Sequence, residues 1–467
     1  MPVVLVLIVV LVIAGLADRA GRPSPNSGST LSTRPSSFVA PPQALSSVWY
    51  CTGGTGPGGL AVPELILANS SATATTATIR EVPNKGRSVS DAVSVPARSQ
   101  VHFAPPKLAG PTDYVAFDVN VAGGGVVVEQ ELTGVLGTTT SKCAARTAKE
   151  WYFGAGSTLV GTYDVITLFN PTPTDGVADL TFSTDQGPTT VGDFQGISVP
   201  AGSLVAVNLG DHVQTRPQIA TTVKARIGRL VVGEIEESNV AGRIGIAVTL
   251  GATQLSTQWY FPNAISSPGT NESYHFYNPS GVPAQVSLTV TLDQGSSSPL
   301  TFTVPPQSQL TVPTTGQSRI PPAIVYHARV RVINHVPILA ERTIGAPSGL
   351  VATIGSSVTA SRWFLAQGVS PDKFTGSVVV LNPGRVPATI SVAFLDGAGK
   401  AGSAPTGPPI KIAPGARLVL SSTATAAGLV ISATAPVVVE RDLVARGGKG
   451  LSAQMAAPAG DWGQGRS

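Results

Sequence analysis

Four glutamates each end a short run of apolar residues. The runs read VVVE, VVGE, ILAE and VVVE, and they end at Glu129, Glu234, Glu341 and Glu440. A carboxylate among apolar residues costs free energy unless it has a hydrogen-bond or charge partner. Arg342 follows Glu341 directly, but neighbouring residues on a strand point to opposite faces, so the two cannot simply pair. We expect each glutamate to bond backbone amides or a neighbouring strand; the alternative is a repeated ligand contact.

The remaining ionisable residues do not have the spacing of a known catalytic or metal centre. The sequence has no H-E-x-x-H, C-x-x-C or G-x-S-x-G motif. Aspartates in predicted turns are single carboxylates, too few for a calcium shell of about six to eight oxygens. The histidines are spread along the chain as His102, His212, His275, His327 and His335. We therefore predict no catalytic residue, no cofactor and no bound metal.

The two cysteines, Cys51 and Cys143, lie near the two ends of the first hundred-residue unit described below. A disulfide between them is expected if the protein works outside the reducing cytosol. The alternative is two unpaired small apolar side chains. We favour the disulfide, because the later units have no cysteine at either place.

A tryptophan followed by a second aromatic residue marks the start of each unit. The tryptophans are Trp49, Trp151, Trp259 and Trp363, so their spacings are 102, 108 and 104 residues. About 20 residues after each, an apolar strand ends in asparagine, and an Asx/Gly turn follows about 15 residues later. Alternating patterns bounded by such turns predict short antiparallel strands, about seven to a unit. This pattern is typical of a β-sandwich resembling the immunoglobulin type.

The sequence thus predicts an all-β protein of four tandem immunoglobulin-like antiparallel sandwiches. The predicted repeats are residues 46–148, 149–256, 257–360 and 361–467. A fifth tryptophan, Trp462, has no fifth unit behind it. We therefore expect each tryptophan segment also to complete the preceding unit, as an edge strand or a cap.

The N-terminus differs from the rest of the chain. Residues 1–17 contain an uninterrupted apolar run, followed by a Ser-, Pro- and Gly-rich linker at 18–45. Sixteen helical residues would span about 24 Å, short of the roughly 30 Å bilayer core, so both an uncleaved anchor and a cleaved signal peptide fit. We favour a single-pass membrane anchor with an extracytoplasmic C-terminal region; a cleaved signal would make the protein secreted.

Several motifs, in order, resemble one family. Trp151-Tyr152-Phe153-Gly154-Ala155-Gly156, the strand-Asn-Pro segments, Val199-Pro200-Ala201-Gly202-Ser203 and Pro436-Val437-Val438-Val439-Glu440-Arg441 resemble the WYFAEG-like tandem repeats of an uncharacterised class of exported actinobacterial proteins. The resemblance covers the chain from about Ser46 to the end. It implies an N-terminal membrane segment and exported β-domains, and it brings no established activity.

The composition limits the function. Charged residues make up 12% and the formal net charge is +4, without a dense basic cluster, so nucleic-acid binding is not expected. We predict a non-enzymatic envelope scaffold that binds another envelope protein or a cell-wall glycan. The first alternative is a carbohydrate-binding array, motivated by the aromatic run Tyr274–Tyr277, and the second is a hydrolase with its active site between units.

Overall fold

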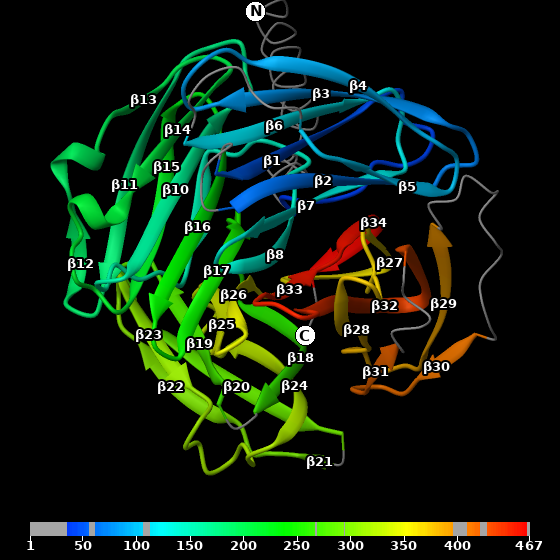
Figure 1. Cartoon of the computed structure of the whole chain (residues 1–467). Helices are drawn as coiled ribbons and strands as arrows, with labels where there is room; N and C mark the ends of the chain where they lie inside the picture. Colours follow the sequence, from blue (N-terminus) through cyan, green and yellow to red (C-terminus); the bar gives the residue numbers. More distant parts are fainter. Residues whose placement is uncertain are drawn as a thin grey trace, which may run out of the picture. The chain divides into compact units, whose positions relative to one another are not determined.

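Strands make up almost all of the regular structure. A computed structural model of the chain describes residues 35–55, 61–105, 113–266, 269–293, 295–395, 409–420 and 427–464. Within these ranges the helical elements are two short 3-10 turns, η2 (Gly192–Phe194) and η3 (Leu209–Asp211) (Figure 1). In this described part, no helix has the length and apolar character needed to cross a membrane. The all-β prediction is confirmed, whereas the predicted segment 1–17 and most of the linker 18–45 lie outside the described residues.

The first pair of sheets shows how the pattern folds. One sheet has the order β1 (Ser47–Thr55), β6 (Tyr114–Val121), β3 (Thr75–Pro83), β4 (Val89–Val95), and the other β5 (Ser99–Phe103), β2 (Ala61–Asn69), β7 (Val126–Gly134), β8 (Gly137–Lys142). In β3 the side chains of Ala77 and Ile79 are buried and those of Thr76 and Thr78 are exposed, as expected for a sheet with one wet face. The inner strands β2 and β7 are buried almost throughout, because both of their faces are covered.

The same pair of sheets recurs three times. The second pair is β9 (Glu150–Phe153), β15 (Ile219–Ile227), β11 (Gly176–Thr184), β12 (Gly187–Thr190) with β13 (Ile197–Val199), and β14 (Ser203–Asn208), β10 (Thr162–Asn170), β16 (Val231–Val240), β17 (Arg243–Leu250). The third is β18 (Gln258–Ser266), β24 (Ile324–Val332), β20 (Ala284–Leu292), β21 (Gly295–Ser296) with β22 (Leu300–Val304), and β23 (Ser308–Pro313), β19 (Asn271–Asn278), β25 (Leu339–Ala346), β26 (Gly349–Ile354).

In the fourth pair, one long strand belongs to both layers. β32 (Gly428–Ala445) lies between β29 (Ala388–Leu395) and β27 (Val358–Leu365) in one layer, and between β28 (Phe374–Leu381) and β33 (Leu451–Met455) in the other. The edges are β30 (Ile410–Ile412), β31 (Arg417–Leu420) and β34 (Ala457–Gln464). We refer to the four pairs as sandwiches one to four.

The strand order is not that of an immunoglobulin domain. There the first two strands share a sheet, whereas here β1 pairs with β6 and β2 pairs with β5 and β7. Hydrophobic alternation indicates which face of a strand is buried, but it is the same for any choice of partner strand. The sequence therefore predicted antiparallel sheets correctly and carried no signal for their order.

Each tryptophan occupies the core of its own sandwich. Trp49, Trp151, Trp259 and Trp363 are at most 2% exposed. The indole of Trp151 donates to the carbonyl of Leu230 at 3.1 Å, and Trp259 and Trp363 make the matching bonds in their sandwiches. In β34, Trp462 is paired with Ala360 of β27, so this segment forms an edge strand of sandwich four.

The inner edge strands of the sandwiches meet one another within the unit Pro35–Ser467. β8 contacts β17, β17 contacts β26, β26 contacts β33, and β33 contacts β8 again, near the centre of Figure 1. Glycine permits this approach at Gly245, where a Cβ would lie 2.4 Å from the backbone nitrogen of Leu350. The four contacts form a closed cycle, so sandwich one touches sandwich four. Exposed sheet edges invite aggregation, and here each inner edge is covered by its neighbour.

Candidate functional site: the carboxylates at the joints

We use joint for the contact between one sandwich and the next around this cycle. At three joints a buried glutamate accepts hydrogen bonds from the backbone turn that follows the tryptophan of the preceding sandwich. Oε2 of Glu341, in sandwich three, accepts from Gly154 N at 2.7 Å and Ala155 N at 3.2 Å. In the same way Glu440 accepts from Asn263 N at 2.9 Å, and Glu129 from Ala366 N at 2.9 Å. The last bond joins sandwich one to sandwich four, which closes the cycle.

The arginine after the glutamate contacts the glutamate of the next sandwich. Arg342 Nη2 lies 2.6 Å from Glu440 Oε1, and Arg441 Nη1 lies 2.8 Å from Glu129 Oε2. Each arginine also donates to a carbonyl in the turn of its own sandwich, Asn263 O or Gln367 O. These side chains are at most 2% exposed. The turns of sandwiches three and four are thus each held between an arginine of their own sandwich and a glutamate of the next.

Glu234 does not occupy the position of the other three glutamates. Glu129, Glu341 and Glu440 pair with the residue three before the asparagine that ends the neighbouring strand. In sandwich two that partner is Thr167, and it pairs with Gly233. Glu234 therefore stands at the arginine position, and a Cβ on Gly233 would lie 2.2 Å from Thr52 Oγ1. The similarity of VVGE to VVVE predicted the wrong position for Glu234, by one residue, because sequence spacing alone does not reveal strand register.

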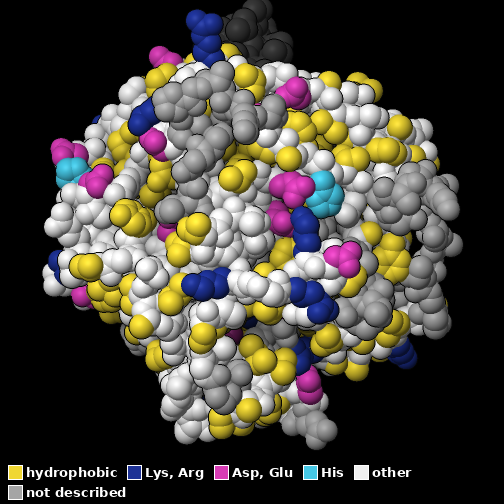
Figure 2. Space-filling model, viewed as in Figure 1, with side chains coloured by type: hydrophobic (Ala, Val, Ile, Leu, Met, Phe, Trp, Pro, Cys, Tyr) yellow, Lys and Arg dark blue, Asp and Glu magenta, His cyan; other side chains and the backbone are white. Residues whose placement is uncertain are grey.

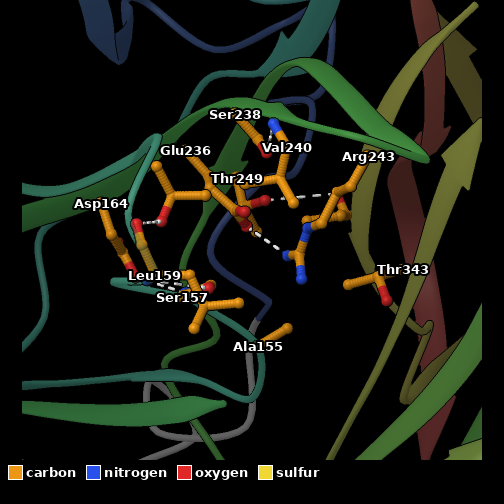
Figure 3. A network of polar contacts seen from close by, with 12 residues as sticks. Ala155, Ser157, Leu159, Asp164, Glu236, Ser238, Val240, Arg243, Thr249 and Thr343 are labelled. Atoms are coloured by element: carbon orange, nitrogen blue, oxygen red, sulfur yellow. Dashed lines mark hydrogen bonds and ion pairs between the residues drawn. The ribbon is translucent and has the colours of Figure 1, made fainter. Parts of the chain in front are cut away.

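This shift places like charges at the joint between sandwiches two and three. Glu234, at the arginine position, lies close enough to Glu341 and Asp164 for their charges to raise its pKa. Asp164 accepts from Ser157 N at 3.0 Å, and Glu236 pairs with Arg243 at 2.7 Å (Figure 3). We call Asp164, Glu234, Glu236 and Glu341 the carboxylate cluster. All four are at most 3% exposed.

Protons take the place of the missing arginine. Burial raises the pKa of Glu341 to about 8, and the nearby charge of Glu236 adds to it. Burial raises the pKa values of Glu234 and Asp164 well above their usual range. The charge of Asp164 adds to the shift of Glu234, the charge of Glu236 adds to that of Asp164, and Glu234 and Asp164 share a hydrogen bond. One oxygen of each cluster carboxylate has no partner within the described residues, as expected for neighbours that share a proton.

The cluster lies inside the protein. Its carboxylates are sealed from solvent, and no group of three or more His, Cys, Asp or Glu among the described residues is placed to hold a metal ion. Sequence reasoning missed Asp164, although a signal existed: Asp164 and Glu272 each lie six residues before Asn170 and Asn278. Glu272 contacts Arg342 at 3.8 Å in the matching place.

The remaining predicted residues have ordinary structural surroundings. Cys51 and Cys143 form a disulfide between β1 and the segment after β8. His275 is buried between Thr311 and Thr343, and burial lowers its pKa to about 3. The whole aromatic run Tyr274–Tyr277 is at most 5% exposed, and the Tyr277 hydroxyl bonds Thr222 of sandwich two at 2.8 Å. These rings are largely covered by neighbouring protein.

Comparisons with known proteins give no activity for this chain. Residues 124–244 match the model of a family of unknown function (DUF5719). The match runs from just before β7 of sandwich one to the first two residues of β17 of sandwich two. No curated protein matches the chain.

Three solved structures show only low similarity to the chain. An Anabaena sensory rhodopsin transducer is 21% identical over 19% of this chain and 94% of its own, with a TM-score of 0.17. A Thermotoga maritima protein is 20% identical over 22% of this chain and 95% of its own, with a TM-score of 0.19. The tetra-tandem repeat of a large adhesion protein is 11% identical over 84% of this chain and 93% of its own, with a TM-score of 0.10.

Proposed function

We propose that the chain is a non-enzymatic scaffold of the cell envelope, in which four tandem sandwiches form an interaction platform. It would be held to the membrane by residues 1–17, with its C-terminal region outside the cytoplasm. The observation that carries the proposal is the closure between sandwiches one and four through Glu129, Ala366 and Arg441. A closed cycle fixes the outer faces of all four sandwiches relative to one another, which suits presentation of several binding surfaces at once.

The charge distribution supports a protein partner or a neutral polymer rather than nucleic acid. On the face in Figure 2, lysine and arginine side chains lie among acidic and uncharged ones. Large apolar side chains that are exposed, such as Val160 at 90% and Tyr163 at 60%, occur singly in the chain. Scattered exposed apolar residues are normal, and they provide positions to probe without disturbing the core.

The test is cross-linking in the intact envelope. A photoreactive amino acid is placed at Val160, Tyr163 or Val386, all more than half exposed, and adducts are identified after membrane fractionation. We expect the chain in the membrane fraction. We also expect at least one site to give the same adduct in independent preparations. A chain that lacks residues 1–17 is the control, and it should be absent from the membrane fraction. Cytosolic fractionation of the full chain, or no adduct at any site, would contradict the proposal.

A groove between sandwiches two and three favours glycan binding as a second candidate function. Its volume is about 490 Å³, and its wall combines Tyr152 and Tyr277 with the hydroxyls of Thr181, Thr189, Thr190 and Thr222 and the charged pair Glu150 and Lys224. Hydroxyls and carboxylates bond sugar hydroxyls well, whereas the mostly buried rings offer little stacking surface. Binding to a cell-wall glycan array that is lost in Glu150→Gln would support this function. Binding unchanged in that variant, or absent altogether, would exclude the groove.

A further inference from the structure

Two small cavities lie where the four inner edge strands meet. One is lined by three successive residues from each strand: 140–142 of β8, 248–250 of β17, 352–354 of β26 and 453–455 of β33. The second also contains Pro35–Ser37 and the segment 356–358 in its wall. Both cavities share Lys142, Leu250, Ile354 and Met455. Three sandwiches thus place an apolar residue at this level, and sandwich one places a lysine.

Lys142 has no acceptor for its charge. It is largely buried, and it is the one ionisable side chain among the residues that line the two cavities. Glu129 lies opposite Lys142 in the ladder of β7 and β8, but its oxygens bond Ala366 N and Arg441. No ion pair or hydrogen bond joins the lysine ammonium to another described residue. Burial alone lowers its pKa, to about 8.

Two further donors, one in the wall of each cavity, also lack acceptors among the described residues. Ser37, 2% exposed, lines the cavity next to Lys142, and its hydroxyl has no partner within the described residues. Gln454, 5% exposed, lines the other cavity, and its Nε2 has none either. Buried donors in proteins are rarely left unpaired. Lys142 and Ser37 therefore line the larger cavity without a described acceptor, and Gln454 lines the adjoining smaller one, which Lys142 also reaches.

We propose that this axial site binds a small monoanion, either chloride or the carboxylate of a short organic acid. In the larger cavity the ammonium of Lys142 supplies the counter-charge and the hydroxyl of Ser37 supplies a hydrogen bond. The space open to the centre of a water molecule is about 50 Å³ in the larger cavity, and about 10–15 Å³ suffices for one water. The site therefore holds an anion of a few heavy atoms and excludes a sugar or nucleotide.

The site has a defined pH dependence. An anion binds the protonated lysine, so affinity is full below the folded pKa of about 8 and declines as the pH rises through it. The cavity walls from β17, β26 and β33 bring no other titrating group. Because all four inner strands contribute to the wall, an anion here would tie the four sandwiches together at the axis.

The test is amine labelling of the full chain, followed by mass spectrometry of the peptides. Sodium acetate or sodium chloride is titrated at constant ionic strength, with gluconate as the replacing anion, at pH 7. We expect the anion to slow acetylation of Lys142 in a saturable way, about tenfold at ten times the dissociation constant. The exposed Lys149 in the same sample is the internal control and should not change. Protection by acetate alone identifies a carboxylate site, and protection by chloride alone identifies a halide site.

Two variants make the test decisive. Lys142→Met copies the residue found in sandwich four, so the fold should tolerate it, and thermal stabilisation by the anion should vanish. Ser37→Ala removes a hydroxyl that has no other bond, and we expect about tenfold weaker protection of Lys142. The proposal is overturned if neither anion protects Lys142 saturably, or if the anion raises the melting temperature of Lys142→Met as much as that of the wild type.

Discussion

Two joints on opposite sides of the cycle neutralise a buried glutamate in different ways. Between sandwiches four and one, Arg441 neutralises Glu129 at 2.8 Å. Between sandwiches two and three, the arginine position holds Glu234, and Glu341 faces a second carboxylate. Each turn is still held by a buried glutamate, so the backbone arrangement does not require the ion pair. A guanidinium balances the charge at one joint, and protons balance it at the other.

The comparison shows that burial, more than the presence of a charged partner, determines whether a joint carboxylate can be ionised. Two ionised carboxylates side by side in a low dielectric are strongly unfavourable, so one or both must stay neutral. A buried ion pair is weak evidence for net stability, but losing one member leaves an uncompensated charge. The two joints should therefore respond oppositely to pH and to loss of a charge.

Loss of Arg441 should have the largest effect. Arg441→Met leaves Glu129 buried without its cation, which typically costs about 3–5 kcal/mol. Chemical denaturation at pH 7 measures the loss of unfolding free energy. The double variant Arg441→Met/Glu129→Gln is the control and should recover most of the stability, because the remaining group is neutral. A loss under about 1 kcal/mol in the single variant would show that the joint does not depend on the pair.

An arginine in the opposite joint should make the two joints alike. Glu234→Arg places a guanidinium where Arg342 and Arg441 stand, beside Glu341 and Asp164. At pH 9, where the wild type must ionise the cluster, we expect a gain of about 1.5–3 kcal/mol, the range for hydrogen bonds to charged groups. Thermal unfolding at pH 5 and 9 measures it, and Ile235→Arg, one residue along and on the opposite face, should not show the gain. Lower stability of Glu234→Arg at pH 9 would contradict the register assigned to Gly233.

Removing the charge of Glu341 should flatten the pH dependence of stability. Its folded pKa of about 8 lies above the usual value of 4.5, so the native state binds more protons than the unfolded chain between these values. The stability from this group is complete below about pH 4.5 and is lost as the pH rises through 8. Glu236 and Glu234 interact with its charge, and His275 lies opposite it in the ladder of β19 and β25.

Glu341→Gln keeps the acceptor for Gly154 N and Ala155 N but cannot ionise. We expect equal stability at pH 5 and a gain of at least about 1 kcal/mol at pH 9, the value of one pKa unit. Glu129→Gln, the matching change at the charge-paired joint, should instead lower stability at both pH values. If Glu341→Gln follows the wild type across the range, the proton does not reside on this carboxylate.

The sequence predicted local features well, because these depend on neighbours in the chain. Alternation in segments such as Thr75–Pro83 gave strands, and Asn69 and its counterparts mark strand ends, where Asn69 Oδ1 accepts from Ser71 N at 2.8 Å. The expectation that Arg342 does not pair with Glu341 followed from strand geometry. The expectation that the glutamates bond backbone amides likewise followed from the cost of burying a carboxylate.

The arrangement of the sandwiches could not be predicted, because its contacts are remote. Glu129 and Ala366 are 237 residues apart, and nothing in the spacing of either indicates the other. The immunoglobulin order failed for a similar reason, since every strand order gives the same alternation. The shift at Gly233 escaped notice because a one-residue change in register leaves the apolar run intact while it changes which side chain faces the joint.

The smallest effect should come from the second cation at the charge-paired joint. Lys373 contacts Glu131 at 3.1 Å and Glu64 at 3.3 Å, but its side chain is 46% exposed. Ion pairs in water typically contribute about 0–1 kcal/mol, because solvent screens them and long side chains lose entropy. Lys373→Gln should therefore change the unfolding free energy by less than about 1 kcal/mol, and less still in 1 M salt. A loss as large as that of Arg441→Met would mean that the total charge at the joint, rather than burial of the ion pair, sets the contribution of the joint to stability. The two joints would then differ in net charge and not in how their buried carboxylates are neutralised.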